Sequence, residues 1–341
     1  MCAIARTDAR FTFRLPKGSW KNSLAEFSKI PVIGIVGPTA SGKTALSVKL
    51  AQALDGEIVS CDSMQIYRQM SVGTAKPSLE EREGVVHHLM DFLDVSEPFS
   101  VADYCKRADE VIRDIHARGK RVLVVGGTGL YFSSLIDHIT FEDQKSDSAL
   151  RERLQREADE YGGEYLLRQL EAFDPETAKS LHPNNVGRII RAIEVYRTTG
   201  QTMSQKQRLS RACESPYLPC LIGLTFRDRA KLYDRIDRRV DLMMEQGLLE
   251  ENRRLLTLPL SDTASQAIGF KEFLPYLYGQ APLEECVENL KRQSRRYAKR
   301  QLTWFRRDAR IFWIYADEHP SFDSILRTAY DRIENRKEMG D

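Results

Sequence analysis

The chain has 341 residues, of which 42% are hydrophobic and 29% are charged, so it is expected to be an ordinary globular protein of about two domains rather than a fibrous or disordered one. Its 51 basic and 49 acidic residues leave a net charge of +2, which by itself indicates no polyanionic partner. Six cysteines without a C-x-x-C pair indicate neither a zinc nor a disulfide framework, and no apolar run is long enough to span a bilayer, so a reducing cytoplasm fits best.

Residues 1–29 are basic, poor in acidic side chains and without a sustained hydrophobic period. They are predicted to form a flexible extension. An organellar presequence has this composition, but an upstream start or a simple tail is the favoured interpretation.

The first half of the chain alternates between strand-like and helix-like segments. A β-branched run, Val32–Val36, predicts a strand and is followed by a glycine-containing loop and by apolar residues at helical spacing up to Leu54. Two further apolar runs, Ile58–Ser60 and Val122–Val125, predict strands, with a helical segment at Val101–Ala117 between them. This alternation predicts an α/β fold with a parallel sheet flanked by helices, in which ligands bind beyond the carboxyl ends of the strands.

The second half begins with a long stretch in which apolar residues recur at helical spacing among many charges, and this pattern predicts an all-helical insertion. After it, strands are predicted at Cys220–Phe226 and Ile311–Tyr315. Long helices are predicted between these strands, at Leu232–Leu256 and Leu283–Phe305. The predicted organisation is an extension at 1–29, a catalytic core at 30–137 and 216–317, the insertion at 138–215, and a C-terminal tail or helix at 318–341.

The strongest single motif is a phosphate-binding loop. Residues 37–44, GPTASGKT, match G-x-x-x-x-G-K-[ST] and lie between a predicted strand and a predicted helix. In such a loop the backbone N–H groups surround phosphate oxygens, Lys43 neutralises charge, and the Thr44 hydroxyl can hold Mg²⁺. The expected diphosphate-binding residues are Gly37, Thr39, Ala40, Ser41, Gly42, Lys43 and Thr44. The motif predicts a diphosphate or triphosphate ligand without specifying ATP.

A hydrolytic carboxylate is missing where a nucleoside triphosphatase usually has one. The strand Val122–Val125 ends in Gly126, Gly127 and Thr128 rather than in an aspartate. Asp62, at the end of another predicted strand, is the acidic residue placed near the phosphate loop. Plain ATP or GTP hydrolysis is therefore disfavoured, and a transferase is favoured.

Positive charge is concentrated in one segment. Residues 287–310 contain nine basic and two acidic side chains, a local charge of +7. Such a stretch is either an electrostatic footprint for a polyanion or a solvated helix face.

Together these motifs resemble the tRNA dimethylallyltransferase (tRNA isopentenyltransferase) family. The resemblance covers about Ile30 to Tyr315 and rests on six ordered blocks: GPTASGKT at 37–44, DSMQIYR at 62–68, VGTAKP at 72–77, GGTGLY at 126–131, HPNNVGRIIRAIEVY at 182–196 and AKRQLTWFRRD at 298–308. It implies a nucleotide-kinase-like core, an insertion that grips the tRNA anticodon stem, and transfer of a dimethylallyl group from dimethylallyl diphosphate to N6 of adenosine 37 with Mg²⁺ as cofactor. No Cys/His zinc motif follows the last block, so the bacterial form is expected, as a monomer.

The resemblance assigns the chemistry to three residues. An adenine amine is a poor nucleophile, so a base must accept its proton as the C–N bond forms, and Asp62 matches that base. Arg239 matches a cation that stabilises the departing diphosphate. Thr128 matches a hydroxyl that contacts substrate near the transfer site.

The resemblance also implies an RNA-binding surface, because the target adenine must leave its stack to react. The matching positions are Asp62, Ser63, Met64, Gln65, Thr128, Arg151, Gly187, Arg188, Ile189, Ile190, Arg191, Lys271, Lys299, Arg300, Gln301, Thr303, Trp304 and Arg306. Two positions depart from the family pattern. Gly187 stands where the family commonly has Gln, and Phe270 stands where it usually has Tyr.

Three alternatives remain open on the sequence. A small-molecule or nucleotide kinase shares the phosphate loop but leaves the basic segment unexplained. A transferase acting on free AMP, ADP or ATP needs neither the insertion nor that segment. A nonenzymatic RNA-binding module does not require Lys43, Thr44 and Asp62.

Overall fold

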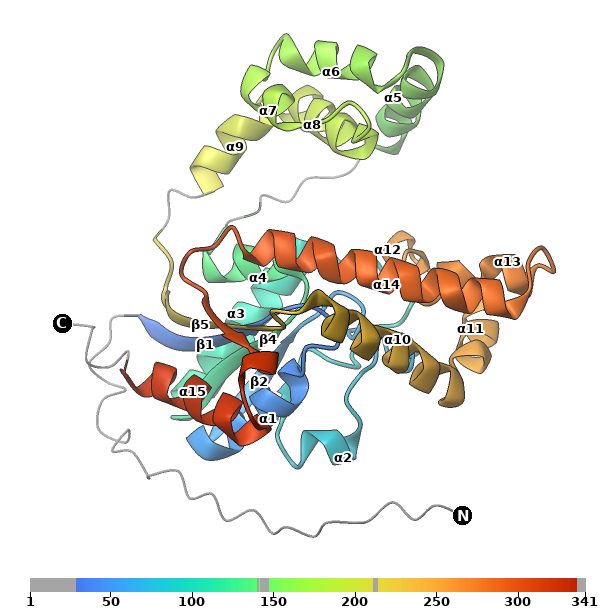
Figure 1. The fold of residues 1–341 in the computed structure, drawn as a ribbon. Coiled ribbons are helices and arrows are strands. Elements are labelled where there is room, and N and C mark those ends of the chain that lie inside the picture. The colour runs from blue at the N-terminus through green and yellow to red at the C-terminus, as the bar shows by residue number, and fades with distance from the viewer. Residues whose placement is uncertain (1–28, 140, 142–146, 211–213, 336–341) are drawn as a thin grey trace. The chain divides into compact units, whose positions relative to one another are not determined.

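The computed structural model describes residues 29–139, 141, 147–210 and 214–335 (Figure 1). The chain divides into two compact units. One contains the residues up to Pro98, Glu110–Gly129 and the residues from Tyr217 onward; the other contains Phe99–Asp109 and Leu130–Pro216. The predicted extension at 1–29 lies outside the described residues except for Lys29, as do the last six residues of the predicted C-terminal segment.

The first unit is built on a six-stranded sheet with the order β3-β2-β4-β1-β5-β6, and every neighbouring pair is parallel. The strands are β1 (Ile30–Val36), β2 (Gly56–Cys61), β3 (His87–His88), β4 (Arg121–Gly126), β5 (Tyr217–Thr225) and β6 (Phe312–Tyr315). The predicted parallel α/β fold is therefore confirmed. The short strand β3 was not predicted, because two residues carry no periodic pattern.

The position of β1 in the middle of the sheet explains its continuous apolar run. Ile35 pairs with Val125 of β4 on one side and with Ile222 of β5 on the other. A parallel strand that is covered on both faces buries side chains in both directions, so it cannot alternate polar and apolar residues. The carboxyl ends of β1, β2 and β4 consequently lie together at one edge of the sheet.

Helices of the first unit pack on this sheet and beside it (Figure 1). They are α1 (Lys43–Leu54), α2 (Leu79–Arg82), α10 (Arg229–Glu245), α11 (Leu248–Leu256), α12 (Asp262–Ser265), η2 (Lys271–Phe273), α13 (Leu274–Leu277), α14 (Leu283–Phe305), η3 (Ala316–Glu318) and α15 (Phe322–Asn335). Leu46 of α1 and Ile325 of α15 share one buried core with Ile35 and Ile222 of the sheet. A separate cluster joins α10 to α14. The helix α3 (Val101–Ala117) lies between β3 and β4 in the chain, and its residues up to Asp109 belong to the second unit. It has the predicted bounds, as α14 does.

One helix prediction was wrong. A single helix was expected over Leu232–Leu256, but the chain forms two, α10 and α11, which are separated at Gly247. Gly247 has a φ of +92°, a left-handed backbone conformation that ends a helix. Residues with a side chain rarely adopt this conformation, so glycine is favoured here. The turn brings Leu248 into a cluster with Val240. Hydrophobic periodicity alone did not reveal the break, because both helices continue the same apolar spacing.

The second unit is helical in its described part, apart from loops. It contains α4 (Gly129–Ile136), whose first residue belongs to the other unit, α5 (Ser148–Tyr161), α6 (Gly163–Glu171), α7 (Pro175–Ser180), α8 (Val186–Thr199) and α9 (Met203–Ser210). Leu154, Leu166 and Ile193 are fully buried in its core. Beside this core Phe173 and Tyr196 stack with ring centroids 4.1 Å apart.

Candidate active site

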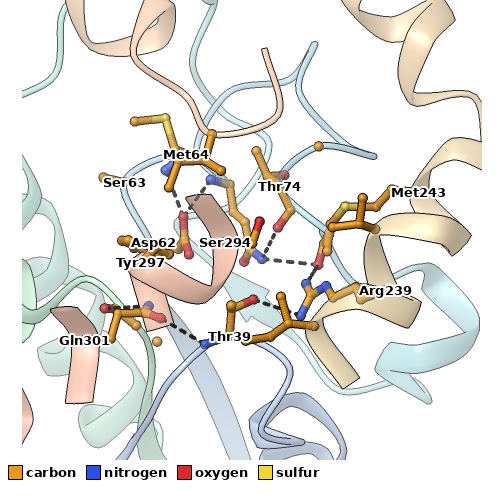
Figure 2. A pocket seen from close by; sticks show the side chains of 18 of the residues that line it. Thr39, Asp62, Ser63, Met64, Thr74, Arg239, Met243, Ser294, Tyr297 and Gln301 are labelled. Carbon is orange, nitrogen blue, oxygen red and sulfur yellow. Dashed lines mark hydrogen bonds between the residues drawn. The ribbon is translucent and has the colours of Figure 1, made fainter. Parts of the chain in front are cut away.

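A cavity of about 340 Å³ lies in the first unit, at the carboxyl ends of β1, β2 and β4 (Figure 2). Its wall combines the phosphate loop, the segments 62–65 and 73–75, and side chains from α10 and α14. The volume is at the small end of the range for small-molecule sites. Its position beyond the strand ends is the one that the sequence predicted for a ligand.

The phosphate loop has the backbone geometry of an anion cradle. A Cβ on Gly37 would lie 2.2 Å from the carbonyl oxygen of Leu224, so only glycine fits there. Ala40 has a φ of +62°, and its carbonyl accepts a hydrogen bond from Nε of Arg235 at 2.9 Å. The Ser41 hydroxyl is buried and has no hydrogen-bond partner among the described residues. A buried donor without a partner fits a loop that is completed by phosphate oxygens.

Two cations lie at this loop: Lys43, which belongs to it, and Arg239 of α10. Nζ of Lys43 donates to the carbonyl of Pro38 at 2.7 Å, while Nη1 of Arg239 donates to the Thr39 hydroxyl at 3.2 Å. Burial lowers the pKa of Lys43 to about 7; the nearby Arg239 adds to this shift, and Asp62 opposes it. Burial likewise lowers the pKa of Arg239. An anionic ligand would therefore stabilise the charged form of both side chains, because its negative charge compensates for the water they have lost.

Asp62 lies at the end of β2 and lines the same cavity (Figure 2). Its Oδ1 accepts the backbone N–H groups of Met64 at 2.9 Å and Gln65 at 3.2 Å. Within the described chain, Oδ2 has no hydrogen-bond donor. Two fixed bonds orient the carboxylate, and the second oxygen is left to accept a proton from a ligand.

Thr128 was predicted as a catalytic residue and lies directly behind this site. Its hydroxyl accepts the N–H of Ser63 at 3.1 Å, but Thr128 does not line the cavity itself. The Thr128 hydroxyl also lowers the pKa of Tyr297 on α14, against the larger effect of burial. Thr128 therefore supports the segment that begins at Ser63, which does reach the cavity.

Tyr297 was missed by the sequence analysis. It lines the cavity beside Asp62, and burial raises its pKa, with the Asp62 charge adding to the effect. Its hydroxyl therefore stays protonated at neutral pH. A helical spacing could have found it, because Leu290, Ser294 and Gln301 line the same wall from α14.

Gln301 was predicted to contact tRNA, but its amide is used within the protein. The side chain is 5% exposed, its Oε1 accepts the N–H of Thr39 at 2.9 Å, and its Nε2 donates to the carbonyl of Gly127 at 3.0 Å. A Cβ on Gly127 would lie 2.1 Å from Nε2. Gly127, directly after the end of β4, thus makes room for Gln301, which ties the phosphate loop to the end of that strand.

The other predicted tRNA positions of the first unit lie mostly on the surface. Lys271, Lys299, Arg300, Thr303 and Arg306 are exposed, and Lys271 and Arg300 also line the cavity. Trp304 is partly buried and packs on Gly129, where a Cβ would lie 2.4 Å from its ring. Phe270 is 5% exposed, so the ring at this position serves packing.

The predicted positions of the second unit differ among themselves. Arg151 and Arg191 both bind Glu194, which is fully buried, with nitrogen–oxygen distances of 2.8 and 2.7 Å. Gly187 and Arg188 are exposed at the start of α8. Ile189 and Ile190 are buried in the helical core, so a role for them in RNA binding would come from the helix as a whole.

A metal ligand was predicted only at Thr44. This residue is exposed at the cavity, and its hydroxyl makes no hydrogen bond with a described residue. The described residues contain no group of three or more His, Cys, Asp or Glu side chains arranged to hold a metal ion. A cation here would therefore need oxygen ligands from the bound phosphate as well, which is the usual arrangement for Mg²⁺.

These features define a phosphate-loop α/β protein whose cavity joins an anion cradle to an oriented carboxylate. The model of the IPP transferase family matches residues 65–308. A tRNA dimethylallyltransferase of Thermoanaerobacter sp. is 47% identical over 301 residues, which cover 87% of this chain and 96% of that protein. The chain therefore belongs to the IPP transferase family, and the resemblance found in the motifs is confirmed.

Solved structures agree with this assignment. The crystal structure of the full-length tRNA isopentenylpyrophosphate transferase of Bacillus halodurans matches with a TM-score of 0.67 and 44% identity, covering 91% of this chain and 99% of that one. A eukaryotic dimethylallyltransferase acting on tRNA matches with a TM-score of 0.73 and 31% identity, covering 89% of this chain and 80% of that one. Among the described residues of this chain, none of the helices is long and apolar enough to cross a membrane.

Proposed function

We propose that this chain transfers a dimethylallyl group from dimethylallyl diphosphate to N6 of adenosine 37 in tRNA, giving N6-(dimethylallyl)adenosine and diphosphate. The observation that carries the proposal is the sharing of one cavity by the phosphate loop, the cations Lys43 and Arg239, and the oriented carboxylate of Asp62. The relatives named above as tRNA dimethylallyltransferases support this choice of donor and acceptor.

The phosphate loop binds the part of the donor that leaves. As the allylic C–O bond breaks, its electron pair passes to the diphosphate oxygen, and negative charge grows there. The amides of the loop, Lys43 and Arg239 face that charge, and donors and cations that are already in place stabilise it as it develops. The same groups hold the donor in the orientation required for attack.

Asp62 acts on the acceptor. N6 of adenine forms the new bond to the allylic carbon, and one of its protons moves to the carboxylate, so atoms and charge balance. Oδ1 is already occupied by two backbone N–H groups, which leaves Oδ2 for this proton. Tyr297, protonated beside Asp62, is placed to donate a hydrogen bond to the entering base.

Mg²⁺ is the proposed metal ion, held by the Thr44 hydroxyl together with oxygens of the donor. When bound, it neutralises part of the diphosphate charge. Thr44 is the second residue of helix α1, directly after Lys43, and it lines the cavity together with the phosphate loop.

We assign tRNA binding to the exposed cations of α14 and, separately, to α8 of the helical unit. Lys299 and Arg300 are exposed, and Arg300 also reaches the cavity. Arg188 is an exposed cation at the start of α8, and Glu194 makes its ion pairs with Arg151 and Arg191 instead. Such contacts give affinity that falls steeply as salt increases.

A double-label assay tests the function. The purified chain is incubated with unmodified tRNA, Mg²⁺ and carbon-labelled dimethylallyl diphosphate, and the tRNA is digested and analysed by mass. Carbon label in a single modified adenosine at position 37 is expected, and omission of Mg²⁺ should stop it. Phosphate transfer from γ-labelled ATP, or modification of free AMP with no label in tRNA, would contradict the proposal. Light scattering is expected to give the mass of a monomer.

A further inference from the structure

Glu251 is a buried carboxylate that belongs to none of the groups discussed above. It lies on α11 and is 3% exposed. Its Oε2 accepts the backbone N–H groups of Ser71 and Val72, each at 2.8 Å, and its Oε1 accepts that of Gly73 at 2.9 Å. Three consecutive amides thus converge on one side chain that is distant in sequence, an arrangement that fixes the shape of a short loop.

The carbonyl groups of this loop contact residues of the active site. The carbonyl of Ala75 accepts a hydrogen bond from Nη2 of Arg239 at 3.3 Å. The carbonyl of Thr74 accepts Nε2 of Gln65 at 3.1 Å. Glu251 therefore holds the amides of a loop whose carbonyls orient a cation and an amide of the cavity. Ala75 has a φ of +45°, an uncommon conformation that such a fixed loop can maintain.

Helix α11 offers a firm base for this contact. Asn252, next to Glu251 and 1% exposed, donates to the carbonyl of Gly269 at 2.6 Å. The N–H of Gly269 in turn donates to Glu272 at 2.9 Å. Leu248 of α11 is fully buried in a cluster with Phe273. The helix is thus tied to a second part of the chain through polar groups that are all satisfied.

We propose that Glu251 is a positioning residue of the transfer site, which sets the loop 71–75 and through it aims the Arg239 guanidinium at the diphosphate. This inference rests on the proposed function in one respect: the anion that Arg239 binds is taken to be the diphosphate of the donor. A guanidinium that is held by a fixed carbonyl loses little freedom when it meets its ligand, so affinity for the anion depends on the loop. Glu251 itself touches neither substrate.

The first test compares Glu251→Gln with Glu250→Gln, an exposed neighbour on the same helix. Glutamine has the same shape but presents a donor to an N–H group, so the loop must change. Isothermal titration with inorganic diphosphate is expected to show a roughly tenfold weaker Kd for Glu251→Gln and no change for Glu250→Gln. The KM for the donor should rise in parallel, while tRNA affinity stays within about twofold. An unchanged diphosphate Kd in a folded Glu251→Gln protein would overturn the proposal.

A double-mutant cycle separates positioning from a general structural role. If Glu251 acts through Arg239, then Glu251→Gln should weaken diphosphate binding little further when it is added to Arg239→Ala. If the two losses multiply in full, Glu251 acts elsewhere, and the proposal fails. The readout is diphosphate binding, so it is independent of catalysis. Failure of the wild-type chain to prenylate tRNA would contradict the proposed function. The double-mutant cycle would still test whether Glu251 acts through Arg239, because it measures diphosphate binding alone.

A measurement on the unaltered chain covers the case in which Glu251→Gln does not fold. Amide hydrogen exchange of Ser71, Val72 and Gly73 should be slow, and diphosphate should slow it further, because coupling between the loop and Arg239 works in both directions. Exchange at the rate of an open loop, or exchange that diphosphate leaves unchanged, would overturn the proposal.

Discussion

The backbone N–H of Thr39 donates to Oε1 of Gln301 at 2.9 Å, although 262 positions separate the two residues. The same amide donates from Nε2 to the carbonyl of Gly127. One buried side chain of α14 thus connects the phosphate loop at the end of β1 to the end of β4. It binds two backbone groups that neither the sheet nor a helix satisfies, which makes Gln301 part of the loop's construction.

We therefore expect Gln301→Ala to weaken diphosphate binding by roughly tenfold and to lower the free energy of unfolding by about 1–3 kcal/mol for each buried group left without its partner. Gln301→Glu keeps an acceptor for the N–H of Thr39, so its diphosphate affinity and its free energy of unfolding should lie between those of the wild type and Gln301→Ala. Diphosphate titration and urea denaturation measure these effects. Gln293→Ala, on the same helix, is the control, since Gln293 bonds only to Asn289. A loss confined to tRNA affinity would instead support the RNA contact that the sequence predicted.

The partly buried Lys43 predicts a particular pH dependence of diphosphate binding. Its pKa of about 7 means that the free protein loses this charge as the pH rises through neutrality. Diphosphate favours the charged form, so binding should take up a proton and weaken above about pH 7. Titration calorimetry in buffers of different ionisation enthalpy measures the uptake.

Lys43→Arg tests the origin of this dependence, because a guanidinium stays charged throughout the range. The part of the pH dependence that Lys43 causes should disappear in this variant. Diphosphate has titrations of its own, and these remain in both proteins, so the difference between them is the informative quantity. Equal proton uptake by the two proteins would contradict the assignment. Lys49→Ala, on the exposed side of α1, should behave like the wild type.

The orientation of Asp62 leads to a prediction about the rate. Asp62→Asn keeps an oxygen for the N–H groups of Met64 and Gln65 but cannot accept the proton. Single-turnover transfer should slow by about 10²–10⁴-fold, while tRNA affinity changes by no more than a few-fold. Asp55→Asn, an exposed aspartate after α1, serves as the control. Normal turnover together with a large loss of tRNA affinity would assign Asp62 to RNA binding.

The parts of this site that carry a local motif or match a family block were predicted, and the contacts that depend on how distant helices pack were not. Residues 37–44 carry their function in a short motif, and the strand ends at Asp62 and Gly126 follow from apolar runs. Gln301 was named only as a tRNA contact and Tyr297 was not named, because their place in the cavity depends on the packing of α14 beside α10. Helical spacing from Gln301 points to Tyr297 once that packing is known. The break at Gly247 was missed because the apolar spacing continues from Val240 to Leu248 across it, although a glycine is itself a common helix end.

Residues 287–305 of the basic segment lie on helix α14, and residues 306–310 follow it. The exposed cations of α14 lead to the last prediction. Replacing Lys299 and Arg300 by Ala should weaken tRNA binding and reduce the slope of log Kd against log salt by about 1 for each tRNA phosphate that the protein no longer neutralises. Donor affinity measured with diphosphate alone should hardly change for Lys299→Ala, because Lys299 does not line the cavity.

Filter binding from low to moderate salt measures this slope. The control is a double replacement of Arg253 and Arg254, two exposed cations of α11, by Ala, which removes the same charge from a different surface. If the two double variants change the slope equally, only the net charge matters. If only the α14 variant reduces the slope, the tRNA backbone lies on α14. A loss of net positive charge alone would weaken long-range attraction to tRNA similarly in both variants at low salt.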